Sequence, residues 1–122
     1  SEFEQVTNVV DAVCKAIDAV LQNMRAGVIG KDMDRIAREI LRKHNELDRY
    51  FIHGLGHGIG IDVHEEPSLS SASEHVLEEG NVVTVEPGVY LRNKFGVRIE
   101  EDIVVTNKGI EKLTKIKRVL EI

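Results

Sequence analysis

Apolar residues recur with helical spacing through the first 24 positions of the chain. They follow one another at steps of three, one and three, which gathers them on one face of an amphipathic helix. Ser1 and Glu4 have the spacing of a capping box, so the helix is expected to begin there. Gly27 and Gly30 are expected to end it and to form the turn that follows. The apolar face comprises Phe3, Val6, Val9, Val10, Val13, Cys14, Ile17, Val20, Leu21 and Met24.

A second helical pattern covers about Asp32 to His44. Its first turn is acidic, with Asp32 and Asp34, and its last turn is basic, with Arg42 and Lys43. The helix dipole favours this distribution of charge. The residues expected to face the core are Met33, Ile36, Ala37, Ile40 and Leu41.

From Phe51 onward the pattern is that of extended chain. Glycine occupies every second position from 54 to 60, which excludes a helix and indicates close approaches between chain segments. Residues 67–73 indicate a surface loop, and residues 78–81 indicate a turn. The strands expected after that turn cover Val82–Glu86, Val89–Leu91, Val97–Thr106 and about Ile110–Leu120, with a hairpin loop at Arg92–Gly96. This order predicts an α+β fold, with two helices packed on one face of a curved antiparallel sheet.

Composition narrows the class of protein. A chain of 122 residues is long enough for one modest domain. Its net charge of −5 argues against nucleic acid as a partner, because phosphate binding needs a basic face. The single cysteine, Cys14, cannot form an internal disulfide. No apolar run has the length of a membrane span and no signal-peptide pattern opens the chain, so no membrane partner and a cytoplasmic location are expected.

The first candidate site is the glycine-rich segment, which holds His53, His57 and His64. Residues four apart in a regular strand share a face, so His53 and His57 are expected to point the same way. Neutral imidazole is a common ligand for transition metals, and the neighbouring glycines leave room for an ion. A dinucleotide-binding loop is disfavoured, since Ile59 stands where its third glycine would be. Taken alone, this histidine pair is more typical of a structural role.

Two carboxylates stand within apolar strands further along the chain. Glu86 takes the face opposite to Val83 and Val85, and a buried carboxylate there would need an ionic partner or a cation. Glu100 shares a face with Arg98, which can hold a carboxylate in place. The alternative is that these charged faces are simply solvated. Strand alternation places Val97, Ile99, Glu101, Ile103 and Val105 on one face and Arg98, Glu100, Asp102 and Val104 on the other.

Three segments, in this order and spacing, resemble the superfamily of methionine aminopeptidase, aminopeptidase P and prolidase. They are Phe51–Gly60 (FIHGLGHGIG), Val85–Tyr90 (VEPGVY) and Gly96–Glu100 (GVRIE). The likeness is closest to Xaa-Pro dipeptidases and aminopeptidase P, and it extends over essentially the whole chain. It implies half of a pita-bread fold, with residues 1–122 forming the C-terminal half of the catalytic domain.

Position by position, the resemblance implies three metal ligands. His57 matches the metal-binding histidine of the family. Glu86 matches the next ligand, which also serves as general acid and base. Glu100 matches the carboxylate that bridges two metal ions.

The resemblance also implies residues that act around the metal. His53 and His64 match histidines that contact substrate and stabilise the tetrahedral intermediate. Arg98 matches an arginine that supports the bridging carboxylate. Glu101 departs from the family, which usually has Asp there, but its side chain is expected on the other face of the strand.

One part of the family pattern has no counterpart. Two further ligands, both Asp, come from a hairpin of the pattern Asp-Gly-x-x-x-Asp-x-Thr-Arg before the first helix, and the sequence contains no such pattern. The chain begins at Ser1 without Met, so it is interpreted as a fragment of a longer protein. A binuclear centre is therefore not expected in this chain. At most one weakly bound metal ion is expected, with weaker binding at acid pH because protons compete for the ligands.

The function implied for the parent protein is that of a metallopeptidase. It would use two divalent ions of manganese, cobalt or zinc and a metal-activated hydroxide to hydrolyse Xaa-Pro bonds, in dipeptides or at peptide N-termini. The substrate would be a peptide with proline at its second position, and the isolated chain should be inactive or nearly so. One alternative is a non-catalytic, peptide-binding member of the superfamily, which the intact His57, Glu86 and Glu100 argue against. Another is a structural domain with solvated charges. An exposed sheet face makes self-association, for example as a homodimer, a further expectation.

Overall fold

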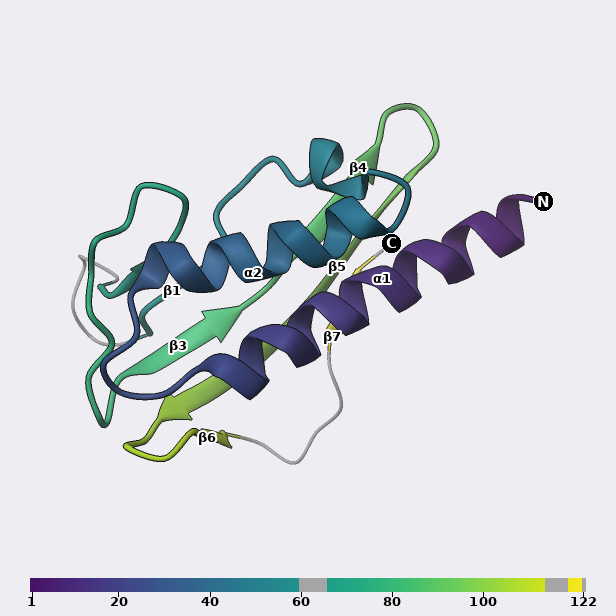
Figure 1. The fold of residues 1–122 in the computed structure, drawn as a ribbon. Helices are drawn as coiled ribbons and strands as arrows, with labels where there is room; N and C mark the ends of the chain where they lie inside the picture. The colour runs from purple at the N-terminus through teal and green to yellow at the C-terminus, as the bar shows by residue number, and fades with distance from the viewer. Residues whose placement is uncertain (60–65, 114–118, 122) are drawn as a thin grey trace.

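Two long helices cover one face of an antiparallel sheet (Figure 1). The structure is a computed structural model that describes residues 1–59, 66–113 and 119–121. Helix α1 spans Glu2–Asn23 and packs against α2, which spans Gly30–Lys43. The Ser1 hydroxyl accepts a hydrogen bond of 3.2 Å from the backbone N–H of Glu4, which confirms the predicted start of α1. A short 3-10 helix, η1 (Leu47–Tyr50), follows α2 and was not predicted.

Strand β5 (Phe95–Val105) is the centre of the main sheet. Along one of its edges run β3 (Val82–Val85) and β4 (Gly88–Leu91), which follow each other along the chain. The short strands β6 (Ile110–Lys112) and β7 (Val119–Glu121) also pair with β5. A separate two-stranded ladder joins β1 (Gly56–His57) to β2 (Ser68–Leu69). All these pairs are antiparallel, as the sequence predicted.

The sheet has one apolar face and one polar face. Alternate residues of β3, β4 and β5 point toward the helices, and most of them are buried. The residues between them are mostly partly accessible, with Thr84 and Gly88 as buried exceptions. The core-facing side chains are Val83, Val85, Val89, Val97, Ile99, Ile103 and Val105, which pack with Val9, Val13, Ile17 and Val20 of α1 and with Met33, Ala37 and Leu41 of α2. The predicted alternation is thus confirmed. Self-association through the opposite face stays a prediction.

Four local predictions need correction. The hairpin loop expected at Arg92–Gly96 is shorter, because β4 ends at Leu91 and β5 begins at Phe95. Gly30 does not belong to the turn after α1 but is the first residue of α2, where a side chain would collide with the Ser68 carbonyl. Gly27 does form the turn, with a φ of +97° that favours glycine. The supposed surface loop at residues 67–73 contains strand β2, and its Leu69 is completely buried. The expected final strand consists, within the described residues, of the separate strands β6 and β7.

None of the helices in the described part of the chain is long and apolar enough to cross a membrane.

Candidate metal centre

A break between β3 and β4 places two glutamates opposite each other. Val85 lies opposite Glu101 and Gly88 lies opposite Arg98, so the register against β5 is the same on both sides of the break. Glu86, within the break, therefore lies directly opposite Glu100 of the neighbouring strand β5. Side chains directly opposite in an antiparallel pair stand about 5 Å apart at Cβ, and like charges in that position repel.

The segment that carries His57 runs along the other edge of β3. Gly58 forms a bridge with Val83, and the Glu86 N–H donates to the Leu55 carbonyl at 2.7 Å. These contacts place His57 beside Thr84, and the His57 N–H donates to the Thr84 hydroxyl at 3.1 Å. His57 therefore lies next to the polar face that carries Glu86 and Glu100.

Glycines on either side of His57 permit this close approach. A Cβ at Gly56 would collide with the Thr84 carbonyl of β3, and a Cβ at Gly58 would collide with the Glu66 carbonyl. The chain can pass between these backbones only without side chains at both positions. Glycines at positions 56 and 58 thus allow the chain to pass close to its neighbours, which places His57 beside the sheet.

The His57 ring is held with one nitrogen available. Its Nδ1 lies 2.9 Å from the Gly58 carbonyl. Since a carbonyl can only accept, Nδ1 carries a proton, and neutral His57 keeps a free lone pair on Nε2. That Nε2 lies 3.6 Å from Glu86 Oε2. Two ligands each about 2.1 Å from a shared ion stand about 3 to 3.6 Å apart, so the pair fits a divalent metal.

Glu100 lies in a strongly acidic environment. Burial is the main cause that raises the pKa of Glu100 to about 7, and a hydrogen bond with Asp102 and the charges of Asp102 and Glu86 act in the same direction. The positive charge of Arg98 opposes the rise of the Glu100 pKa, because it favours the ionised carboxylate. The Oδ1 atom of Asp102 is buried without a hydrogen-bond partner. This surplus of acceptors on the polar face suits a cation.

The candidate ligands are not assembled in advance. Within residues 1–59, 66–113 and 119–121, no three His, Cys, Asp or Glu side chains converge closely enough to hold a metal ion. His57 and Glu86 form a close pair, whereas Glu100 bonds to Asp102. The donor types fit a divalent ion, but Glu100 would have to be ionised and turn away from Asp102 to join the other two.

His53 makes a different set of contacts. The chain bends at His53 and Leu55, so it is not the regular strand on which the expected common direction of His53 and His57 depended. His53 Nδ1 donates to the Gly54 carbonyl at 2.7 Å, and Nε2 accepts from the Tyr90 hydroxyl at 2.7 Å. Tyr90 lies on the same sheet face as Glu86. The rings of His53, which bonds to Tyr90, and of His57, which lies near Glu86, therefore both reach that face. His64 lies outside the described residues.

The sequence analysis assigned no role to two residues that shape this face, Thr84 and Tyr90. The Tyr90 ring lies over Gly88 and Gly96, where any side chain would meet it. Thr84 is almost completely buried and accepts from the backbone of His57. The signals available in the sequence were the strand alternation, which places Thr84 two residues before Glu86 and Tyr90 four residues after it, and the presence of Tyr90 in the segment Val85–Tyr90.

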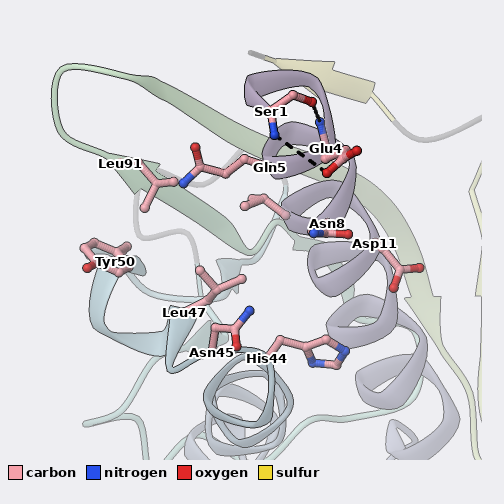
Figure 2. Close-up of a pocket in the computed structure, with 11 residues that line it drawn as sticks. Ser1, Glu4, Gln5, Asn8, Asp11, His44, Asn45, Leu47, Tyr50 and Leu91 are labelled. Carbon is pink, nitrogen blue, oxygen red and sulfur yellow. Dashed lines mark hydrogen bonds and ion pairs between the residues drawn. The ribbon is translucent and has the colours of Figure 1, made fainter.

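A cavity lies at a different place, between the start of α1, the end of α2 and η1. Its volume is about 690 Å³, and Figure 2 shows polar side chains around it, among them Glu4, Asn8 and His44. None of the candidate ligands lines it. His44 Nδ1 donates to the Ile40 carbonyl at 2.9 Å, as is common near a helix end.

Comparisons with known proteins agree with the resemblance. Residues 1–107 match metallopeptidase family M24. The chain is 41% identical over 120 residues to a Xaa-Pro dipeptidase of Pyrococcus furiosus, an alignment that covers 98% of this chain and 34% of that relative. It thus spans about a third of the length of the relatives it matches.

Solved structures give the same result. The X-Pro aminopeptidase of Thermotoga maritima superposes with a TM-score of 0.88 at 45% identity, over 94% of this chain and 32% of that one. The prolidase of Pyrococcus horikoshii superposes with a TM-score of 0.88 at 40% identity, over 97% of this chain and 34% of that one. The predicted α+β fold, as part of a pita-bread domain, is confirmed. The chain belongs to metallopeptidase family M24.

Proposed function

We propose that residues 1–122 form the C-terminal half of the catalytic domain of a proline-specific metallopeptidase and supply His57, Glu86 and Glu100 as its metal ligands. The observation that carries the proposal is the 3.6 Å approach of His57 Nε2 to Glu86 Oε2, with Nδ1 committed to the Gly58 carbonyl. Glu100, opposite Glu86 in the sheet, adds the third donor.

The bound metal would supply an activated water for attack on the peptide carbonyl. Glu86 has a side chain only 16% exposed, so its carboxylate is partly shielded from water and placed to accept a proton and return it. Arg98 keeps Glu100 closer to its ionised form, since its charge lowers the pKa of that carboxyl. His53, held by Tyr90, and His64 would contact the substrate.

The substrate proposed is a peptide with proline at its second position. The similar proteins that support it are Xaa-Pro dipeptidases and an X-Pro aminopeptidase. Dipeptides and the N-termini of longer peptides remain equal candidates. The cytoplasmic location stays a prediction.

Metal titration tests the ligand assignment. Isothermal titration of the chain with Mn²⁺ at pH 8 should give weak binding to a single site. His57→Ala and Glu86→Gln should each lower the affinity at least about tenfold, because each removes a ligand. His44→Ala is the matched control and should bind as the unchanged chain does, since His44 caps the end of α2, its ring bonds to the Ile40 carbonyl, and it lines the cavity that contains none of the candidate ligands. Equal loss in the control, or no heat at millimolar Mn²⁺, would count against the assignment.

A peptidase assay tests whether the isolated chain holds only part of the catalytic site. The isolated chain, with added Mn²⁺ or Co²⁺ and an Xaa-Pro dipeptide, should show no turnover above that of His57→Ala. A longer protein that contains this segment together with the two Asp ligands should hydrolyse the same dipeptide. Turnover by the isolated chain at ordinary enzymic rates would contradict the proposal that it holds only part of the site.

A further inference from the structure

A partly buried ion pair on α2 contacts the loop that carries His53 and His57. Asp34 is only 1% exposed, which is unusual for a carboxylate on a helix that has a solvent-accessible face. Arg38 Nε donates to Asp34 Oδ1 at 2.6 Å, and Arg38 Nη2 lies 3.4 Å from Oδ2. The other charged residues of α2 that form ion pairs, such as Arg35 with Asp32, do so at the surface.

The remaining donors of Arg38 reach across to the backbone of the loop. Nη1 donates to the Phe51 carbonyl at 2.9 Å, and Nη2 donates to the His53 carbonyl at 2.8 Å. The guanidinium also lies 4.2 Å from the centre of the Phe51 ring. One side chain therefore fixes two alternate carbonyls of the loop and stacks on a buried ring between the helix and the sheet.

Asp34 extends the same contact by one further step. Its Oδ2 accepts from the Leu55 N–H at 3.2 Å, and the same N–H also donates to the Leu69 carbonyl at 2.7 Å. The Leu55 carbonyl in turn accepts from the Glu86 N–H at 2.7 Å. Three hydrogen bonds thus connect α2 with positions 51, 53 and 55 of the loop, and a fourth connects Leu55 with a candidate metal ligand.

We propose that Asp34 and Arg38 are positioning residues that set the place of the His53–His57 loop relative to Glu86, and thereby the separation of the candidate ligands. The inference rests on the proposed function for its metal readout. Neither side chain touches His57 or Glu86, so both act through the backbone of Phe51, His53 and Leu55. A lysine at position 38 would keep the charge opposite Asp34 but would lack the planar fork of donors with which Arg38 reaches Asp34 and both loop carbonyls at once.

The test compares Arg38→Lys with Arg42→Lys. Arg42 lies one turn further along α2, is exposed, and receives the same substitution as a matched control. Amide hydrogen exchange by NMR should become at least about tenfold faster at Leu55 and Glu86 in Arg38→Lys. Exchange at Leu77, which donates to the Val28 carbonyl elsewhere, should not change. The Mn²⁺ affinity should fall at least about tenfold, in the range found when partners behind metal ligands are removed.

A second variant is included in case Arg38→Lys fails to fold. Asp34→Asn/Arg38→Gln removes both charges together, so no unpaired charge stays buried, and it should show the same faster exchange at Leu55 and Glu86. Unchanged exchange and Mn²⁺ affinity in Arg38→Lys, or an equal change in Arg42→Lys, would overturn the proposal. If the unchanged chain binds no Mn²⁺, the proposed function fails, but the exchange rates at Leu55 and Glu86 still decide whether the pair positions the loop.

Discussion

Replacement of Glu100 by glutamine should stabilise the metal-free chain at alkaline pH. The carboxyl of Glu100 faces Glu86 and bonds to Asp102, and burial with these neighbours raises its pKa from 4.5 to about 7. The folded state therefore holds the proton more tightly than the unfolded state does. The resulting stability is fully present below about pH 4.5 and is lost as the pH rises through about 7.

The size of this effect follows from the rise in pKa. A rise from 4.5 to about 7 corresponds to at most about 3 kcal/mol in the free energy of unfolding. Glu100 is partly accessible, so solvent screening reduces the value, and about 1 to 2 kcal/mol is expected. Glutamine keeps the shape and the hydrogen-bonding capacity of the protonated carboxyl but never acquires its charge.

Urea unfolding at pH 5 and pH 8 measures the effect. Between these values the unchanged chain should lose about 1 to 2 kcal/mol relative to Glu100→Gln. Glu79→Gln, at an exposed turn, is the matched control and should follow the unchanged chain. A stability difference between the chain and Glu100→Gln that does not vary with pH would refute the argument, as would a variant less stable at pH 8.

Three further changes test the packing and the charges. Gly56→Ala should destabilise the fold by about 1 to 3 kcal/mol in urea unfolding, because the added methyl collides with the Thr84 carbonyl; a neutral result would show that β1 can move freely. Leu41→Ala should lower the free energy of unfolding by about 2 to 5 kcal/mol, since Leu41 is fully buried, while the slope of that free energy against urea concentration should not change. Asp102→Asn should lower the pKa of Glu100 in a carboxyl NMR titration, because it removes a negative neighbour; an unchanged or higher pKa would contradict the assigned cause.

Much of the fold was predictable because local patterns and burial agree. The alternation through residues 97–105 predicted which side chains enter the core, and each apolar one of them is buried. The bounds of α1 and α2 differ from those expected by one or two residues, apart from the role of Gly30. Gly30 does not end a helix. It lacks a side chain at a point where α2 comes close to the Ser68 carbonyl, and such a contact between distant segments leaves no local pattern in the sequence.

The site was predictable only in part. Strand period placed Glu86 and Glu100 on the polar face, but their direct opposition depends on a register that continues through Pro87. The role of Arg38 could not be predicted, since its partners are the backbone carbonyls of Phe51 and His53, which any residue type could provide. A sequence pattern reports on side chains, whereas the contacts of Arg38 depend on where the backbone carbonyls of the loop lie. They could therefore not be predicted from the pattern.

The hairpin between β4 and β5 links the core to the site. Its three-residue loop contains Asn93 with a φ of +63°, and the Lys94 N–H donates to the Leu91 carbonyl at 3.0 Å. This loop sets which residues of the two strands face each other. A slip of one residue would turn the side chains of a strand to the opposite face, so it would expose the core valines and bury the glutamates together. The repulsion between Glu86 and Glu100 is therefore maintained by the burial of the apolar residues between them, and a cation or a proton on Glu100 can relieve it without any change of register.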